Sequence, residues 1–101
     1  MSADIDVQID ETIKQITEEP EKHKVIILND DQTPMDWVIS ILVDIFKHSE
    51  ETAKDLTLTI HEEGGGVAGI YTYEVAESKS VEVINASRDQ GFPLNVRLEK
   101  E

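Results

Sequence analysis

Three polar side chains follow directly after a short apolar run. Asn29, Asp30 and Asp31 come after residues 25–28, whose composition indicates a strand that is buried on both faces. An amide and two carboxylates at the end of such a strand offer hydrogen-bond acceptors to a small cation. The same residues also fit a simpler interpretation, an Asx-rich turn that only leads into the next helix.

The residues after this polar group have the features of a helix start. Thr33 can accept hydrogen bonds from free backbone N–H groups, and Pro34 suits the first helical position because it lacks an N–H group. Asp36 follows Thr33 at the spacing of a capping box. We therefore expect Thr33 to cap a helix and the polar residues to be held between that helix and the strand.

His61 could complete a binding site at this point. It lies four residues after Thr57 on a predicted helix, so the two side chains share one face. If this helix folds back against the end of the strand, His61 meets Asn29 and Asp30. The alternative is a surface histidine near a helix C-terminus, where the helix dipole favours it. Beside the polar group, an apolar hollow would be formed by Met35, Val38, Thr57 and Ile60.

The residue types narrow the chemistry of this candidate site. Asp30 and His61 supply the carboxylate and base of a triad, but no serine or cysteine stands in a strained turn beside them, so a nucleophile is lacking. Residues 29–31 lack the spacing of a calcium loop, and His23 and His48 form no two-histidine motif. We expect no catalysis, metal or cofactor. A free protein N-terminus fits the site, because its ammonium can meet the polar groups while its first side chain enters the hollow.

The periodicity of the chain predicts the elements that hold these residues. After the strand over residues 25–28 come helices over residues 34–47 and 49–63, a strand over residues 67–72, a helix over residues 73–90 and a strand over residues 94–98. The order βααβαβ indicates a single α+β domain, with three helices packed on a three-stranded antiparallel sheet. Ser49 and Thr72 are expected to cap the second and third helices. The third helix should turn Val75, Ala76, Val83 and Ala86 inward.

Composition limits the partners. The chain has 101 residues, with 9 basic and 22 acidic side chains and a formal charge of −13, which repels nucleic acid and anionic membrane surfaces. It has no cysteine, no secretory leader and no apolar segment long enough to span a membrane, so we expect a cytoplasmic protein. Residues 1–22 are acidic and contain no aromatic side chain, which predicts a flexible tail before a core domain of residues 23–101.

From residue 23 onward the sequence resembles the ClpS family, N-degron adaptors that deliver substrates to a Clp AAA+ unfoldase. The resemblance rests on residues 25–31 running into 33–35, on His61, on residues 69–79 and on residues 93–100. It implies that Asn29, Asp30 and His61 bind the α-amino group of a substrate whose first residue is Leu, Phe, Tyr or Trp. It also implies a side-chain pocket lined by Thr33, Met35, Val38, Ile60 and Leu94, with Asp31 alongside.

The resemblance also implies a docking surface and shows one departure. Glu74 and Lys79 would contact the N-terminal domain of the unfoldase, which could be ClpA-like or ClpC-like, and the tail would be engaged during delivery. Where ClpS proteins similar to this one often carry methionine in the pocket wall, this chain has Thr57, which should widen the pocket and make one wall more polar.

Two alternatives stay open at this point. The βααβαβ order also resembles the C-terminal domain of the ribosomal stalk protein, a docking module without a ligand pocket. An enzyme that uses Asp30 and His61 is the third possibility.

Overall fold

In the computed structural model, which describes residues 21–101, three helices pack on a three-stranded antiparallel sheet. The strands β1 (Lys22–Leu28), β2 (Gly65–Thr72) and β3 (Asn95–Lys100) lie in the order β2-β1-β3, so β1 is paired on both sides. The helices are α2 (Met35–Asp44), α3 (Glu50–Glu63) and α4 (Tyr73–Asp89). The predicted α+β fold is confirmed, with the elements in the predicted order.

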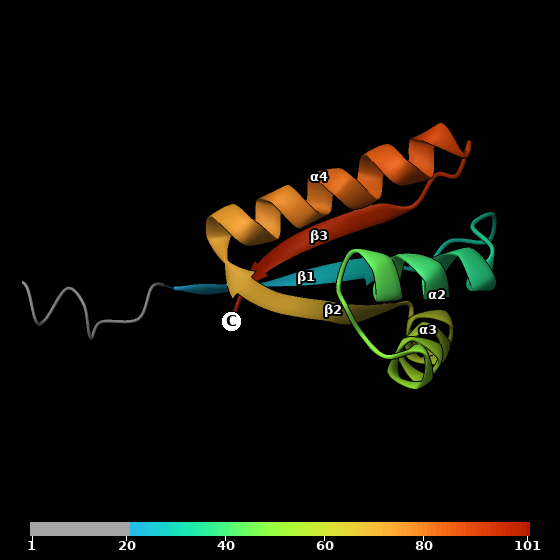
Figure 1. Ribbon diagram of the computed structural model, residues 1–101, viewed down its shortest axis with the longest axis horizontal. Coiled ribbons are helices and arrows are strands. Elements are labelled where there is room, and N and C mark those ends of the chain that lie inside the picture. The colour runs from blue at the N-terminus through green and yellow to red at the C-terminus, as the bar shows by residue number, and fades with distance from the viewer. Residues whose placement is uncertain (1–20) are drawn as a thin grey trace, which may run out of the picture.

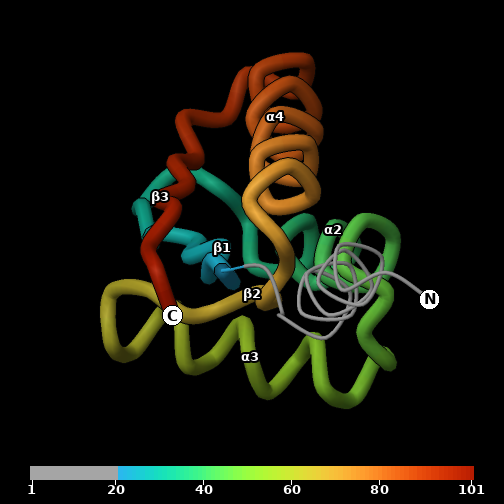
Figure 2. Tube along the Cα trace, turned by 90° about the vertical axis from the view of Figure 1, so that its left-hand side faces the viewer, coloured from blue at the N-terminus to red at the C-terminus, as the bar shows by residue number. Residues whose placement is uncertain are grey.

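The predicted tail over residues 1–22 lies outside the described residues except at its end. There, Lys22 already belongs to β1, where it pairs with Thr72 of β2. Figure 1 shows α4 running along the sheet next to β3, with α2 and α3 gathered near the end of β1 where the chain leaves the sheet. In the turned view of Figure 2, β1 lies at the centre, with α4, α2 and α3 arranged around it and β2.

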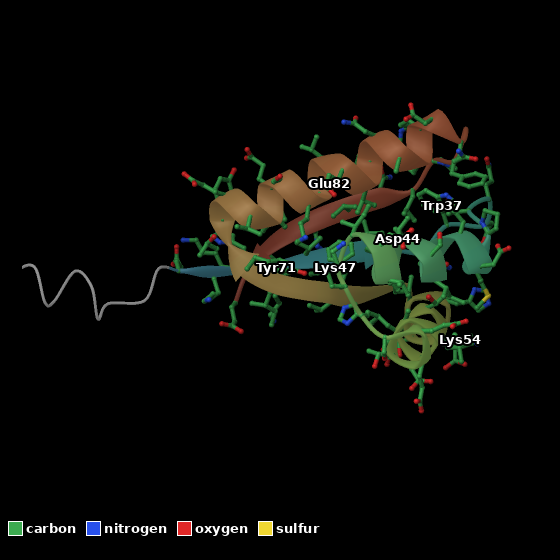
Figure 3. All side chains as sticks on the ribbon, viewed as in Figure 1. Trp37, Asp44, Lys47, Lys54, Tyr71 and Glu82 are labelled. Carbon is green, nitrogen blue, oxygen red and sulfur yellow. The ribbon has the colours of Figure 1, made fainter. Side chains whose placement is uncertain are left out.

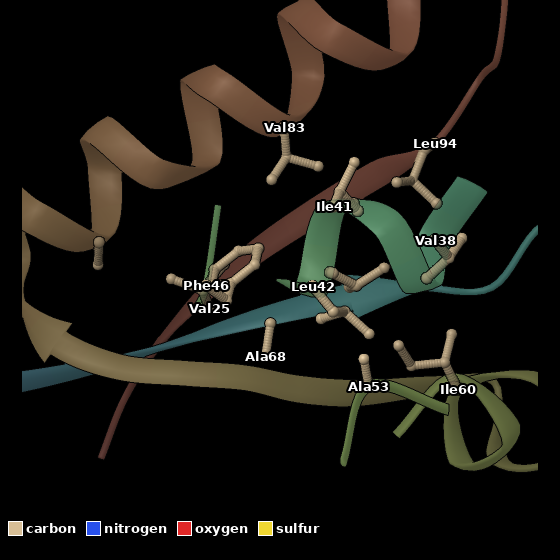
Figure 4. Packing of buried hydrophobic residues seen from close by; sticks show 12 residues of the cluster. Val25, Val38, Ile41, Leu42, Phe46, Ala53, Ile60, Ala68, Val83 and Leu94 are labelled. Atoms are coloured by element: carbon tan, nitrogen blue, oxygen red, sulfur yellow. The ribbon is translucent and has the colours of Figure 1, made fainter. Parts of the chain in front are cut away.

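The core lies between the sheet and the helices. Val25 and Ile27 of β1 are fully buried and Ile26 is 8 % exposed, which confirms a strand buried on both faces. Leu42 of α2 and Val83 of α4 meet this strand from the helical side and are also fully buried (Figure 4). Burying one such aliphatic side chain stabilises the fold by about 1.5–3 kcal/mol. The packing of Val25 and Ile27 against the helices therefore holds β1 in place.

Small residues bring α4 close to the sheet. Its buried positions are Ala76, Ser80, Val83 and Ser87, and the two serine hydroxyls donate within the helix to the carbonyls of Ala76 and Ile84, each at 2.9 Å. The prediction for Ala76 and Val83 is confirmed. That for Val75 was wrong, because Val75 is 44 % exposed and falls off the face that the two serines share with Ala76.

A bulge in the sheet gives His48 a structural role. The register of β1 with β2 shifts between Val25 and Ile26, which leaves Ala68 as an extra residue on β2. The ring of His48 bonds to the Ala68 carbonyl, and because that oxygen only accepts, the ring N–H is the donor. The bond fixes the connection between α2 and α3 against the sheet.

The helix ends agree with prediction at some positions and differ at others. Ser49 caps α3, since its hydroxyl accepts from the N–H of Thr52 at 3.1 Å, and Gly64 ends it with φ +87°. Helix α2 ends at Asp44, three residues before the predicted end at Lys47, whose φ is +62°. Thr72 precedes α4 as expected but makes no side-chain capping bond.

Candidate functional site

The carboxylate of Asp30 organises the loop between β1 and α2. Its Oδ1 accepts the N–H groups of Gln32 and Thr33, each at 2.8 Å, and its Oδ2 accepts the Thr33 hydroxyl at 2.7 Å. The Asx turn is therefore present. The prediction that Thr33 caps α2 was wrong. The N-cap is Pro34, which makes no side-chain bond, and the Thr33 hydroxyl donates to Asp30 instead.

These bonds control the charge of Asp30. Partial burial alone would raise the pKa of its carboxyl, but the Thr33 hydroxyl, the two N–H groups and the positive charge of Arg88 together outweigh it, so the pKa lies below its usual value. The carboxylate is consequently ionised at neutral pH and oriented by its own loop. An oriented anion of this kind suits a cationic ligand.

One backbone hydrogen bond joins the end of β1 to the end of α3. The N–H of Asn29 donates to the carbonyl of Gly64 at 3.0 Å, and Gly64 is the residue that ends α3. His61 lies in the last turn of the same helix. The second helix of the βαα unit thus folds back against the strand end, and His61 is brought to Asn29 and Asp30 as predicted.

A single narrow pocket brings the predicted residues together. The walls are formed by Leu28, Asn29, Asp30, Thr33, Met35, Val38, Thr57, Ile60, His61 and Leu94. Every residue predicted for the ammonium site and the side-chain pocket is included except Asp31, which is exposed and does not line it. Leu28 lines the pocket although no prediction named it. As the last residue of β1, it lies directly before the polar group.

The apolar walls of the pocket differ in their exposure. Val38, Ile60 and Leu94 are at most 5 % exposed, and Figure 4 shows them around one end of the core. Met35, in contrast, is 39 % exposed at the first position of α2. The space between these side chains has room for about one water molecule, so a bulky ligand side chain can enter only if the walls move apart. The long, flexible side chain of Met35 is the wall best able to move.

The hydroxyl of Thr57 is bonded within its own helix. It is 2 % exposed, and its hydroxyl donates to the carbonyl of Ala53, one turn earlier in α3, at 2.7 Å. The donor of this hydroxyl is therefore used within the helix, and only its oxygen could still accept a hydrogen bond from a ligand. The expectation of a wider pocket with a more polar wall at Thr57 stays a prediction.

Glu74 and Lys79 belong to a different surface. Glu74 is exposed in the first turn of α4, beside a shallow hollow that it shares with His23 and Tyr73. Lys79 donates to the carbonyl of Ile45 at 2.8 Å and lies 5.5 Å from the ring centre of Tyr71, which Figure 3 labels on β2. Neither residue lines the narrow pocket, so ligand binding and docking at these residues would use separate surfaces.

The part of the chain that the structure describes contains neither a metal-binding cluster nor a membrane-spanning helix. Within residues 21–101, no three His, Asp or Glu side chains lie together in a way that could hold a metal ion. No helix there has the length and apolar composition needed to cross a membrane.

Comparison with known proteins places the chain in a family. Residues 18–97 match the family model described as ATP-dependent Clp protease adaptor protein ClpS. The chain belongs to the ClpS family. This membership favours the ClpS resemblance over the resemblance to the C-terminal domain of the ribosomal stalk protein.

Named members of the ClpS family align with nearly the whole chain. The ClpS adapter protein of Oleidesulfovibrio alaskensis is 44 % identical over 97 residues, which are 96 % of this chain and 89 % of that protein. The one from Campylobacter jejuni is 49 % identical over 83 residues, 82 % of this chain and 86 % of that protein. Among solved structures, Agrobacterium tumefaciens ClpS2 bound to L-phenylalaninamide matches with a TM-score of 0.79 at 35 % identity, covering 82 % of this chain and all of that one.

Proposed function

We propose that this protein is an adaptor that binds protein substrates by their N-terminal residue and delivers them to a Clp AAA+ unfoldase for degradation. The observation that carries the proposal is the convergence of Asn29, the ionised Asp30 and His61 at the mouth of one apolar pocket. The ligand of the Agrobacterium relative supports it, because L-phenylalaninamide has the free α-amino group and large side chain of a substrate's first residue.

The polar end of the pocket suits an α-ammonium group. That group has three N–H donors, which the Asp30 carboxylate, the Asn29 side-chain carbonyl and a His61 ring nitrogen or a bridging water would accept. Hydrogen bonds that involve a charged group are worth about 1.5–3 kcal/mol each. Acetylation removes both the charge and two of the donors, so an acetylated N-terminus should not bind.

The apolar end would select the side chain. Burying a leucine or phenylalanine side chain contributes about 1.5–3 kcal/mol. Set against the several kcal/mol that association costs, the two ends together predict a dissociation constant on the order of micromolar. An affinity in this range suits an adaptor that must release its substrate. Each step is a binding equilibrium, so the adaptor needs no catalytic residue of its own.

We further propose that the unfoldase docks on the surface of α4 that carries Glu74 and Lys79. Both lie away from the pocket, so a bound substrate would leave this surface free. A ClpA-like or a ClpC-like unfoldase would fit the proposal equally.

A peptide titration tests the proposed function. Peptides that differ only in their first residue would be titrated by fluorescence anisotropy, each with a free and with an acetylated N-terminus. We expect micromolar binding of free Leu, Phe, Tyr and Trp peptides and none of the acetylated forms. Asp30→Asn, which removes the charge at constant size, should lose most of the binding. Equal affinity for free and acetylated peptides would overturn the proposal.

A further inference from the structure

Arg88, in the last turn of α4, holds the loop that leads into the pocket. Its Nη1 lies 2.9 Å from the carbonyl oxygen of Phe92 and 2.9 Å from that of Leu94, and its Nη2 lies 3.3 Å from Oδ1 of Asn95. Nη1 also lies 3.1 Å from the hydroxyl of Ser87. One planar guanidinium therefore connects the end of the helix with three positions of the chain that follows it.

Two backbone hydrogen bonds also hold this loop. Gly91, with φ +77°, reverses the chain, and the N–H groups of Gly91 and Phe92 bond back to the carbonyls of Arg88 and Ser87 at 2.9 and 2.8 Å. The reversal brings loop carbonyls next to the negative end of the α4 dipole. The positive charge of Arg88 offsets this concentration of acceptors.

The position of this loop decides the position of Leu94. Leu94 is 1 % exposed, lines the pocket, and follows Pro93 at the start of the approach to β3. Because the pocket is narrow, a small displacement of Leu94 changes the shape available to a ligand side chain. Arg88 is itself not a lining residue, but it bonds to the backbone carbonyl of Leu94 directly.

We infer that Arg88 is a positioning residue for substrate selection: its guanidinium fixes Leu94 as one wall of the side-chain pocket. That this wall helps to select substrate side chains rests on the proposed function. Arg88 also lies near enough to Asp30 to help keep the pKa of that carboxyl low, although it is the smallest of the contributions. It thus acts on both ends of the pocket, by geometry on Leu94 and by charge on Asp30.

Trp37 reports the position of the loop without any ligand. It is the single tryptophan of the chain, and its ring lies edge-to-face against Phe92 with a centroid distance of 5.3 Å and an interplanar angle of 75°. Figure 3 shows Trp37 where α2 approaches the end of α4. Its fluorescence and near-UV circular dichroism should therefore respond when Phe92 moves.

The test compares Arg88→Lys with Arg97→Lys. Lysine keeps the charge at position 88 but loses the planar fork that reaches several acceptors. Arg97 is a matched control, because it lies on β3, its side chain is 57 % exposed, and its ion pair with Glu99 at 3.3 Å is on the surface. We expect Arg88→Lys, and not Arg97→Lys, to change the Trp37 signal while the far-UV spectrum stays the same.

Peptide binding gives the second readout. In Arg88→Lys the ratio of affinities for Phe-starting over Ala-starting peptides should fall roughly tenfold, as expected when one bond to a charged group is lost. The ratio for free over acetylated peptides should remain, because Asn29, Asp30 and His61 are untouched. In Arg88→Gln, which also lacks the charge, the acid limit of binding should in addition move to higher pH as the pKa of Asp30 rises.

The outcomes separate this inference from the proposed function. An unchanged Trp37 signal with an unchanged Phe-to-Ala ratio overturns it. So does a uniform loss of affinity with a lower melting temperature, which would mean that Arg88 only stabilises the fold. If the wild-type protein fails to distinguish free from acetylated peptides, the proposed function fails, and the Trp37 signals of the two lysine variants still decide whether Arg88 positions the loop.

Discussion

The hydroxyl of Thr33 donates a hydrogen bond to Oδ2 of Asp30 across 2.7 Å. Together with the two N–H groups on Oδ1, three donors occupy a carboxylate that has about four acceptor positions. Asp30 thus keeps about one position for a ligand. An ammonium group bound there would place its other two donors elsewhere, and Asn29 and His61 are the neighbouring acceptors that we propose for them.

Replacing Thr33 with valine should move the acid limit of peptide binding to higher pH. Thr33→Val keeps the branched shape but removes the hydroxyl that lowers the pKa of Asp30. A carboxyl with a lowered pKa stays ionised, and keeps its interactions, until the pH falls through that lowered value. In the variant this point returns toward the ordinary aspartate value of about 3.9. Affinities for a Phe-starting peptide, measured from neutral to acid pH, should diverge below about pH 5. Identical acid limits would mean that the hydroxyl does not control Asp30.

Shortening Met35 should admit β-branched first residues. Met35 is the most exposed apolar side chain in the pocket lining, and we expect its stem to narrow the entrance. Met35→Ala should therefore bind Val- and Ile-starting peptides that the wild-type protein rejects, with a gain of about tenfold, the value of one or two buried methylene groups. Leu58→Ala is a suitable control, because Leu58 is 48 % exposed on α3 and does not line the pocket. Continued rejection by Met35→Ala would show that the gate lies elsewhere.

Enlarging Thr57 should shift the preference toward smaller side chains. Thr57→Met adds volume to a wall that is already buried, so Trp- and Phe-starting peptides should lose more affinity than Leu-starting ones. Thr57→Val is the matched control. Since the hydroxyl of Thr57 is bonded to Ala53, its removal should cost some stability and leave the order of preference unchanged. If Thr57→Val altered the preference as strongly as Thr57→Met, the hydroxyl would have to face the ligand.

Adding a methyl group at Gly69 should destabilise the fold through Tyr71. A Cβ at Gly69 would come within 2.6 Å of two carbon atoms of the Tyr71 ring, which also packs near Phe46 and beneath Lys79. Gly69→Ala should lower the free energy of unfolding by roughly 1–3 kcal/mol in urea denaturation. The same change in a Tyr71→Ala background should have little effect, because the clash is gone. Additive effects in this double-mutant cycle would rule out the ring as the cause.

Reversing the charge of Glu74 should block delivery without weakening substrate binding. Glu74 is exposed on α4 and does not line the pocket. We expect Glu74→Lys to abolish Clp-dependent degradation of a Phe-starting reporter while its peptide affinity stays within about twofold of wild type, as for surface substitutions away from a binding site. Glu82→Lys, which makes the same charge change farther along the helix, is the control (Figure 3). Equal delivery by the two variants would place the docking surface elsewhere.

The order of the elements could be predicted because it depends on local patterns. The apolar run before Asn29, the serine before α3 and the glycine after it each act within a few residues of their own position, and Ser49 and Gly64 behave as predicted. The convergence of His61 with Asp30 also followed from the βαα order. Of the pocket lining, Thr33 and Leu94 were implied only by the family resemblance, since no local pattern connects Leu94 with Val38.

Other features depend on which of several possible partners a side chain bonds to, and the sequence does not show that choice. Thr33 has the spacing of a helix cap, yet the nearby Asp30 carboxylate takes its hydroxyl. Ser87 counts as polar in a hydrophobicity pattern, yet it is buried, because its hydroxyl donates to the carbonyl of Ile84 within the helix. Arg88 looks like any basic residue at the end of a helix, and only the folded loop shows how many acceptors it reaches.

The hydrogen bond from Asn29 to Gly64 joins the end of β1 to the end of α3, on two sides of the pocket, through main-chain atoms alone. Substituting a lining side chain therefore leaves this connection in place. For the proposed adaptor, the set of accepted first residues can therefore be altered by single substitutions such as those at Met35 and Thr57, while the connection between β1 and α3 is kept.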